Sequence, residues 1–147
     1  MADVERFAAL VSSDGGLAVV SVVRQGPQVH SSVANAGVLD HPLTGEKVVG
    51  LVIAGGARKL GYLRVQGRAT VTLRAGWGWA TAEGPIELIG PDDPAPGIDP
   101  ERLRLLLREI FTAAGGTHDD WDEYDRVMAA ERRTAVLLKP ERVYGVG

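Results

Sequence analysis

The sequence predicts a mainly β protein of the α+β class, an antiparallel barrel of about six strands with helices packed outside it. Strand-like runs rich in β-branched residues recur between glycine- and proline-containing turns over the first ninety residues. Two helical patterns follow within residues 99–131, and a last strand pattern ends the chain. Strands and helices hardly alternate, which disfavours a parallel sheet. A length of 147 residues fits a single domain over residues 1–147.

The first half of the chain is predicted to hold a short helix and three antiparallel strands. Residues 3–11 place apolar side chains on one helical face, and the segment SSDGG at 12–16 ends that helix. Strand patterns at 17–24 and 28–34 are joined by Gln25-Gly26-Pro27, which is a hairpin signal. A turn at 40–46 leads into the third strand, residues 47–54.

A glycine turn and a basic segment follow the third strand. Gly55-Gly56 ends the apolar run, and Leu60 and Leu63 then recur at helical spacing. Free N–H groups at a helix N-terminus, beside Arg58 and Lys59, favour an anion such as a cofactor phosphate. Basic residues at a turn are also typical of a solvated face. The segment is neither a Walker A loop nor a Rossmann fingerprint, because both glycine patterns are absent.

The second half of the chain adds the remaining strands and the better-marked helices. Strands are predicted at 68–74 and 77–88, and the Pro/Gly-rich residues 90–98 form a linker. Asp99 followed by Pro100 begins a helix that runs to Gly115-Gly116. A second helix is predicted from 119 or 120 to 131. A final strand, 134–138, continues past Lys139-Pro140 towards 143–144.

Composition narrows the class of function. The chain has no cysteine, which excludes disulfides, thiolate catalysis and Cys-based metal sites. A net charge of −3 gives no electrostatic signature for nucleic acid, so a small-molecule partner is favoured. No apolar run is long enough to span a membrane, and the N-terminus has no signal-peptide pattern. We expect a cytoplasmic protein with no nucleic-acid or membrane partner.

No catalytic constellation is visible in the sequence, and no catalytic residue is assigned. The three histidines, His30, His41 and His118, are far apart in sequence, so no metal site is expected. Trp77 and Trp79 are two residues apart and are predicted to share one face of a strand. That face suits either stacking on a planar ligand or filling the barrel interior.

Several motifs resemble one known family. The segment ARKLGYL at 57–63, followed by GRAT at 67–70, resembles the basic region of the pyridoxamine 5'-phosphate oxidase-like split β-barrel flavoproteins. The segments GWGWATAEG (76–84), HDDWDEY (118–124), ERR (131–133) and VYG (143–145) are similar to one branch, the coenzyme F420 (deazaflavin)-dependent oxidoreductases. The chain departs from the family pattern at two positions. Ala57 stands where the family often has Ser or Thr, and Tyr62 stands where it often has Asn.

The resemblance implies an FMN-binding-like split β-barrel that forms a homodimer with a cofactor groove at the subunit interface. By position in the motif, Arg58 and Lys59 would hold the cofactor phosphate. The residues implied near the cofactor ring, its side chain or the partner subunit are Val52, Ile53, Ala54, Gln28, Ser31, Trp77 and Trp79.

The implied function is that of an F420-dependent reductase, which transfers a hydride from the reduced deazaflavin to an electron-poor organic acceptor. Because the cofactor carries the hydride, the protein needs no conspicuous catalytic acid. Two alternatives keep the fold: an F420-binding or carrier protein without its own substrate, and an FMN-dependent pyridoxamine-phosphate-oxidase-like enzyme.

Overall fold

Over residues 3–146, the chain forms seven antiparallel strands and four helices. The computed structural model describes residues 3–146. In chain order the elements are α1 (Val4–Asp14), β1 (Leu17–Gln25), β2 (Gln28–Asp40), β3 (Lys47–Ile53), α2 (Arg58–Gln66), β4 (Arg68–Ala75), β5 (Gly78–Ile89), α3 (Pro100–Ala113), α4 (Trp121–Ala130), β6 (Thr134–Leu138) and β7 (Arg142–Val146).

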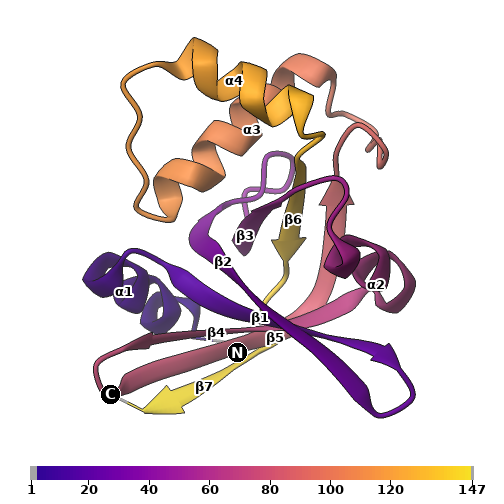
Figure 1. Ribbon diagram of the computed structural model, residues 1–147. Coiled ribbons are helices and arrows are strands. Elements are labelled where there is room, and N and C mark those ends of the chain that lie inside the picture. Colours follow the sequence, from indigo (N-terminus) through magenta and orange to yellow (C-terminus); the bar gives the residue numbers. More distant parts are fainter. Residues whose placement is uncertain (1–2, 147) are drawn as a thin grey trace.

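Six of the strands close a barrel. Their order is β4-β1-β2-β3-β6-β5, and β5 pairs back with β4 to complete the circuit, while β7 is an extra strand on β5. All the pairings are antiparallel. The helices lie outside the barrel, with α3 and α4 together beyond one side and α1 and α2 on opposite flanks (Figure 1). The predicted antiparallel barrel with peripheral helices is confirmed.

The C-terminal strand pattern forms two strands, where the sequence predicted one that continues. Both run along the same edge of β5: β7 pairs with residues 79–83 and β6 with residues 86–89. Between them Lys139 N donates to Pro85 O at 2.9 Å, and Glu141 N donates to Glu83 O at 3.0 Å. Gly84 allows the segment between β6 and β7 to lie this close to β5, because a Cβ there would lie 1.9 Å from Lys139 O.

β2 is longer than its predicted end at residue 34. It pairs with β1 up to Asn35 and with β3 from Ala36 onward, so it belongs to two parts of the barrel. Asn35, Ala36 and Gly37 are weak strand formers, which hides the continuation in the sequence. Gly37 is needed because a Cβ there would lie 2.4 Å from the backbone of Ala113 at the end of α3.

Two apolar clusters stabilise the fold. The barrel interior includes helix residues as well as strand residues, since Phe7 of α1 and Leu60 and Leu63 of α2 are fully buried in it. The second cluster lies between the β3–β6 side of the barrel and the helices, around Leu106 and Ile110 of α3. α3 and α4 therefore form a layer held against the barrel wall.

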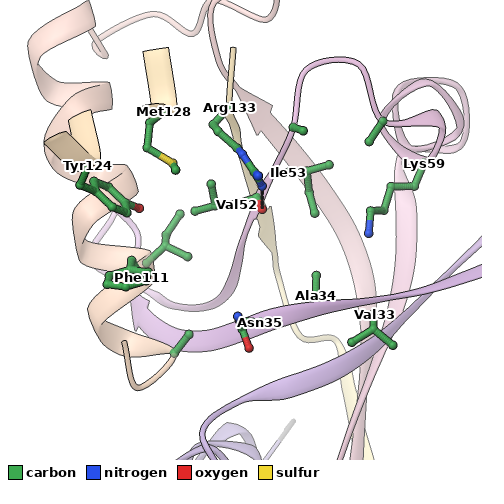
Figure 2. A pocket seen from close by; sticks show the side chains of 14 residues that line it. Val33, Ala34, Asn35, Val52, Ile53, Lys59, Phe111, Tyr124, Met128 and Arg133 are labelled. Atoms are coloured by element: carbon green, nitrogen blue, oxygen red, sulfur yellow. Dashed lines mark hydrogen bonds between the residues drawn. The ribbon is translucent and has the colours of Figure 1, made fainter. Parts of the chain in front are cut away.

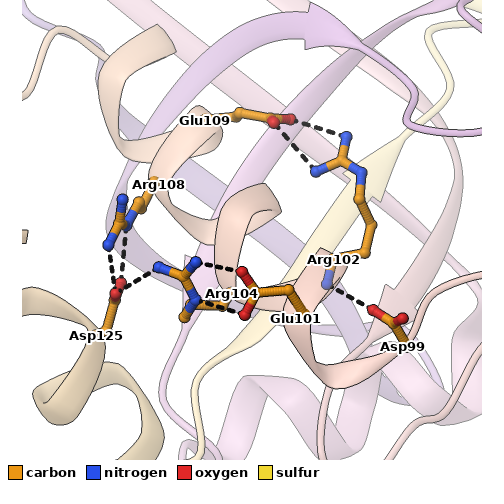
Figure 3. Close-up of polar contacts among 7 residues, drawn as sticks. All are labelled: Asp99, Glu101, Arg102, Arg104, Arg108, Glu109 and Asp125. Atoms are coloured by element: carbon orange, nitrogen blue, oxygen red, sulfur yellow. Dashed lines mark hydrogen bonds and ion pairs between the residues drawn. The ribbon is translucent and has the colours of Figure 1, made fainter. Parts of the chain in front are cut away.

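An ion-pair network fixes α4 to α3 (Figure 3). Asp125 of α4 accepts hydrogen bonds from Arg108 Nε at 2.9 Å and from Arg104 Nη1 at 2.7 Å. Glu101 also pairs with Arg104. The guanidinium groups lower the pKa of Asp125, and Arg108 has the larger effect.

Within residues 3–146, no helix has both the length and the apolar character needed to cross a membrane.

Candidate functional site

The candidate site lies where β2 and β3 separate. The two strands pair from Asp40–Lys47 to Ala36–Leu51, and no pairing continues beyond that point. β2 runs on with β1, and β3 runs on with β6, so the facing edges of residues 33–35 and 52–54 diverge. No strand-to-strand hydrogen bonds cross this split between residues 33–35 and 52–54. Val52 O accepts from Arg133 and Ala54 O accepts from Ala57 N, and the other polar groups along the two edges are available to a ligand.

A cavity of about 420 Å³ fills this opening. Its floor is formed by residues 33–35 of β2, and its inner wall by Val52, Ile53 and Ala54. Lys59 reaches in from α2, Arg133 enters from the start of β6, and Phe111, Tyr124 and Met128 of α3 and α4 close the far side (Figure 2). The volume is within the usual range for small-molecule and cofactor sites, roughly 300–1,000 Å³.

Lys59 supplies a positive charge that no carboxylate neutralises. Its Nζ donates to Ser32 Oγ at 2.8 Å, and within residues 3–146 no acidic oxygen lies in salt-bridge range of it. Burial lowers the pKa of Lys59, and the nearby charge of Arg133 lowers it further. A partly buried cation without a counter-ion favours an anionic ligand.

Lys59 also lies in the first turn of a helix whose start is open. Ala57 is the N-cap of α2 and has no side chain that can bond the first-turn N–H groups. The other three helices are capped by aspartates, Asp3, Asp99 and Asp120. Ala57 itself lines the cavity, so the positive end of the helix dipole faces the same space as Lys59.

Arg133 is the second cation of the cavity. Its Nε and Nη2 bind Glu131 at 2.8 and 2.7 Å, and its Nη1 donates to Val52 O at 3.4 Å. The preceding residue, Arg132, has a φ of 51°, in the left-handed region. Gly55 packs on that turn so closely that a Cβ would lie 2.7 Å from Arg132 O. Gly55, which ends the apolar run of β3, therefore also allows the turn before β6 to pack against it.

The aromatic side chains of the far wall are held in place by the helices. Tyr124 donates its hydroxyl to Leu107 O at 3.0 Å and lies 5.0 Å, between ring centroids, from Phe111. Burial raises the pKa of Tyr124 to about 12. The hydroxyl keeps its proton at physiological pH and uses it in the bond to Leu107 O, so Tyr124 forms a fixed part of the cavity wall.

Four of the predicted site residues come together in the cavity, and five do not line it. Lys59, Val52, Ile53 and Ala54 line the cavity. Arg58 begins α2 but is exposed and is not part of the cavity wall. Two further predicted residues, Gln28 at the β1–β2 turn and Ser31, whose hydroxyl bonds Ser21 at 3.0 Å, lie on exposed parts of β2.

The tryptophans are not arranged as the sequence suggested. Trp77 lies in the two-residue turn between β4 and β5 and is 97 % exposed, so it does not share a strand face with Trp79. The strand begins at Gly78, because Gly76 has a φ of 63° and forms a tight turn with Trp77. Trp79 packs edge-on against Tyr144 with ring centroids 6.1 Å apart. Neither tryptophan lines the cavity of this chain.

Sequence reasoning missed Ser32, Asn35, Phe111, Tyr124 and Arg133. Ser32 follows the predicted Ser31, but the alternation of a strand turns the two side chains to opposite faces. Arg133 lies in the ERR segment at 131–133, for which the family resemblance implies no cofactor contact. Phe111 and Tyr124 carried only a helix-face signal, which does not distinguish core from cavity wall.

No catalytic acid, base or metal centre stands out in the site. Across the described part of the chain, no three His, Asp or Glu side chains gather as metal ligands do. The arrangement can hold an anionic, partly planar molecule between two cations, two strand edges and an aromatic wall.

The comparisons with known proteins concern the fold. No family model matches the chain. A conserved hypothetical protein of Mycobacterium tuberculosis superposes with a TM-score of 0.69 at 18 % identity, over 99 % of this chain and 84 % of that one. A pyridoxamine 5'-phosphate oxidase-related, FMN-binding protein of Nostoc punctiforme gives 0.68 at 13 % identity, over 99 % and 84 %. The fold is the FMN-binding split barrel. An F420 reductase shares this split barrel, with a TM-score of 0.61 and 9 % identity over 92 % of this chain and 94 % of that one.

Proposed function

We propose that the split-barrel cavity binds a flavin-type cofactor and that the chain is an F420-dependent oxidoreductase. The observation that carries this proposal is Lys59, a partly buried lysine without a carboxylate partner, bonded to Ser32 at the mouth of an open helix N-terminus. The branch-specific motifs of the sequence favour F420 over FMN. The F420 reductase among the structural neighbours agrees with that choice, and the FMN-binding neighbour supports the alternative.

The donor set of the cavity fits such a cofactor. The uncapped first turn of α2, with Lys59 and Ser32, offers charged and neutral donors to a phosphate. The β3 edge at 52–54 and the β2 edge at 33–35 offer backbone groups to the polar edge of a ring. Phe111 and Met128 provide the apolar surface that a planar ring needs.

The roles of the cofactor and of the protein residues follow from these positions. A deazaflavin supplies the hydride when it is bound, and the protein supplies its binding, orientation and electrostatic surroundings. Lys59 and Ser32 would anchor the tail, which fixes where the ring lies along the split. Val52, Ile53 and the aromatic wall would limit access of water to one side of the ring. The open side of the cavity is left for an electron-poor acceptor.

A second copy of the chain is the partner that the surface favours. The outer face of the β1–β2 hairpin exposes Leu17, Val19, Val23, Val29 and Val33. Val19 is paired with Val33, and Val23 with Val29, so the exposed side chains are neighbours across the strands. The Ser21–Ser31 pair lies between these two valine pairs on the same face. A largely apolar exposed face of this kind is typical of an interface. Val33 is 58 % exposed and also lines the cavity, so a subunit on this face would border the cofactor.

The test of the proposed function is a parallel titration with F420 and FMN, followed by absorbance and fluorescence quenching. We expect saturable one-to-one binding of F420 that is tighter than the binding of FMN. Tight FMN binding without F420 binding would move the chain to the FMN-dependent alternative. Absence of binding by both would refute the cofactor proposal. Oxidation of the reduced cofactor by quinones or conjugated ketones would then separate an enzyme from a carrier.

A further inference from the structure

We propose that Arg133 is a second anion contact, at the ring end of the cavity, so that the site selects a planar ligand carrying two separated acidic groups. One group, phosphate-like, would meet Lys59 and Ser32. The other, an acidic imide or enolate edge of the ring, would meet Arg133. This inference rests on the proposed function and extends it by naming the residue that contacts the polar edge of the ring.

The two cations reach the cavity from different elements. Lys59 extends from α2 on one side, and Arg133 comes down from the start of β6 above Val52, with the cavity between them (Figure 2). They are near enough for Arg133 to lower the pKa of Lys59. Like charges facing one space repel each other, and a ligand with an acidic group for each of them removes that cost. A ligand with a single anionic end at Lys59 leaves Arg133 compensated by Glu131 alone.

Arg133 has donors left for a ligand. An arginine has five N–H donors, and Glu131 engages only Nε and Nη2. Nη1 points to Val52 O at 3.4 Å, which is long for a hydrogen bond. Glu131 balances part of the charge from the outer side, while the side chain of Arg133 still lines the cavity. A planar, two-pronged donor suits the polar edge of a ring better than an ammonium group does.

The backbone around Arg133 is built to hold it there. Arg132 lies in the left-handed region at φ 51°, a conformation that costs energy for a residue with a side chain. Gly55 N donates to Glu131 O at 3.0 Å, which ties the loop after β3 to this turn. Strain kept at a cavity edge and braced by the neighbouring loop is typical of a positioned ligand contact. Arg133 also borders the second cavity, of about 410 Å³, between α3, α4 and residues 89–100.

The test compares ligands with and without the phosphate. The ligands are F420 with its tail-free ring-and-ribityl fragment, and FMN with riboflavin. Each is titrated against the parent, Lys59→Ala, Arg133→Gln, Arg133→Lys and the control Arg102→Gln. Arg102 is a matched control, since it pairs with Glu109 at 3.0 Å on α3 and does not line the cavity. Melting temperatures without ligand verify that each variant is folded.

The two cations should give different patterns. Lys59→Ala should weaken the phosphate-bearing ligand and leave its phosphate-free partner unchanged, which removes the preference between them. Arg133→Gln should weaken both members of a pair by the same factor, about tenfold, and keep the preference. Arg133→Lys should recover only part of the loss. Arg102→Gln should bind as the parent does.

Three results would overturn the inference. They are unchanged binding in Arg133→Gln, a loss confined to the phosphate-bearing ligand, and full recovery of binding in Arg133→Lys. If Arg133→Gln does not fold, Arg133→Lys decides between a ring contact and a purely structural role. Failure of the parent to bind any of the four ligands would refute the proposed function itself, and with it this inference.

Discussion

Lys59→Ala is the sharpest test of the anion site. The change removes an ammonium group that is partly buried and bonded to Ser32 at 2.8 Å, without touching the apolar cavity wall. If Lys59 donates a charge-assisted bond to a cofactor phosphate, the loss should cost about 1.5–3 kcal/mol, roughly a ten- to hundredfold rise in Kd. The cofactor's effect on stability should shrink accordingly.

The expected shifts in melting temperature follow from mass action. At a ligand concentration of about 100 times Kd, the parent gains about 2.7 kcal/mol, or roughly 5–11 °C for a domain of this size. At the same concentration the variant gains only about 0.4–1.4 kcal/mol, or roughly 1–6 °C. The hydride step at saturating cofactor should stay near normal, because a phosphate contact is equally strong in ground and transition states.

Without ligand, Lys59→Ala should be at least as stable as the parent. The pKa of Lys59 is lowered in the folded state, chiefly by burial, so its charged form is disfavoured there relative to the unfolded chain. Below the folded pKa, Lys59 therefore reduces stability. Between the folded pKa and the ordinary lysine pKa of 10.5, the unfolded chain binds more protons and stability rises with pH. This rise should be smaller in the variant.

The control for this experiment is Lys47→Ala. Lys47 lies at the other end of β3, is exposed, and pairs with Asp40 at 2.8 Å on the surface. Its removal should leave the binding of F420 and FMN unchanged. If Lys59→Ala binds cofactor as tightly as the parent, or is unfolded without ligand, the reasoning that Lys59 is an anion anchor is wrong.

Three further predictions test the parts that hold the site. Val33→Lys places a charge on the proposed dimer interface and should yield a monomer. In light scattering, the parent should have twice the chain mass of 15.6 kDa and the variant a single chain mass. A monomeric parent would contradict the interface. Gly55→Ala should cost about 1–3 kcal/mol in urea denaturation, because the new Cβ meets Arg132 O at 2.7 Å; an unchanged midpoint would contradict this. In the parent, the ionised Asp125 stabilises the fold above the unfolded pKa of this carboxyl, and this stability is lost as the pH falls through its lowered folded pKa. Asp125→Asn should lack this contribution, so its melting temperature should fall less than that of the parent on acidification. Equal falls in melting temperature for the two proteins would contradict this.

Much of the fold could be predicted because the local signals agree with the tertiary structure. Asp99-Pro100 marks the start of α3, and the side chain of Asp99 accepts from Arg102 N at 2.8 Å. The turn before β5 and the β-branched run of β3 also lie close to where the sequence predicted them. Failures arose where a long-range contact decides the structure. Examples are the extension of β2 past Ala34 and the division of the last strand at Gly84.

The site could be predicted only in part, for a related reason. The basic segment gave Lys59, and the strand beside it gave Val52, Ile53 and Ala54, since a motif close in sequence stays close in space. Arg133 lies more than seventy positions further along the chain, and β6 brings it beside Val52 through the pairing of Val52 with Ala135. No spacing in the sequence reports that neighbourhood.

The cavity exists because β2 is paired with two different strands along its length. Its first part needs β1 as far as Asn35, and its second part needs β3 from Ala36, so β3 cannot follow it past Leu51. A slip of β3 by one residue against β2 would turn Leu51 out of the barrel cluster towards the α3–α4 layer, and Val52 from that layer into the barrel. The burial of Leu51 and Ala36 therefore fixes the register, and the register fixes the width of the opening. Core packing and the proposed cofactor binding are coupled at this point: a substitution that loosens Ala36 or Leu51 should weaken ligand binding before it unfolds the barrel.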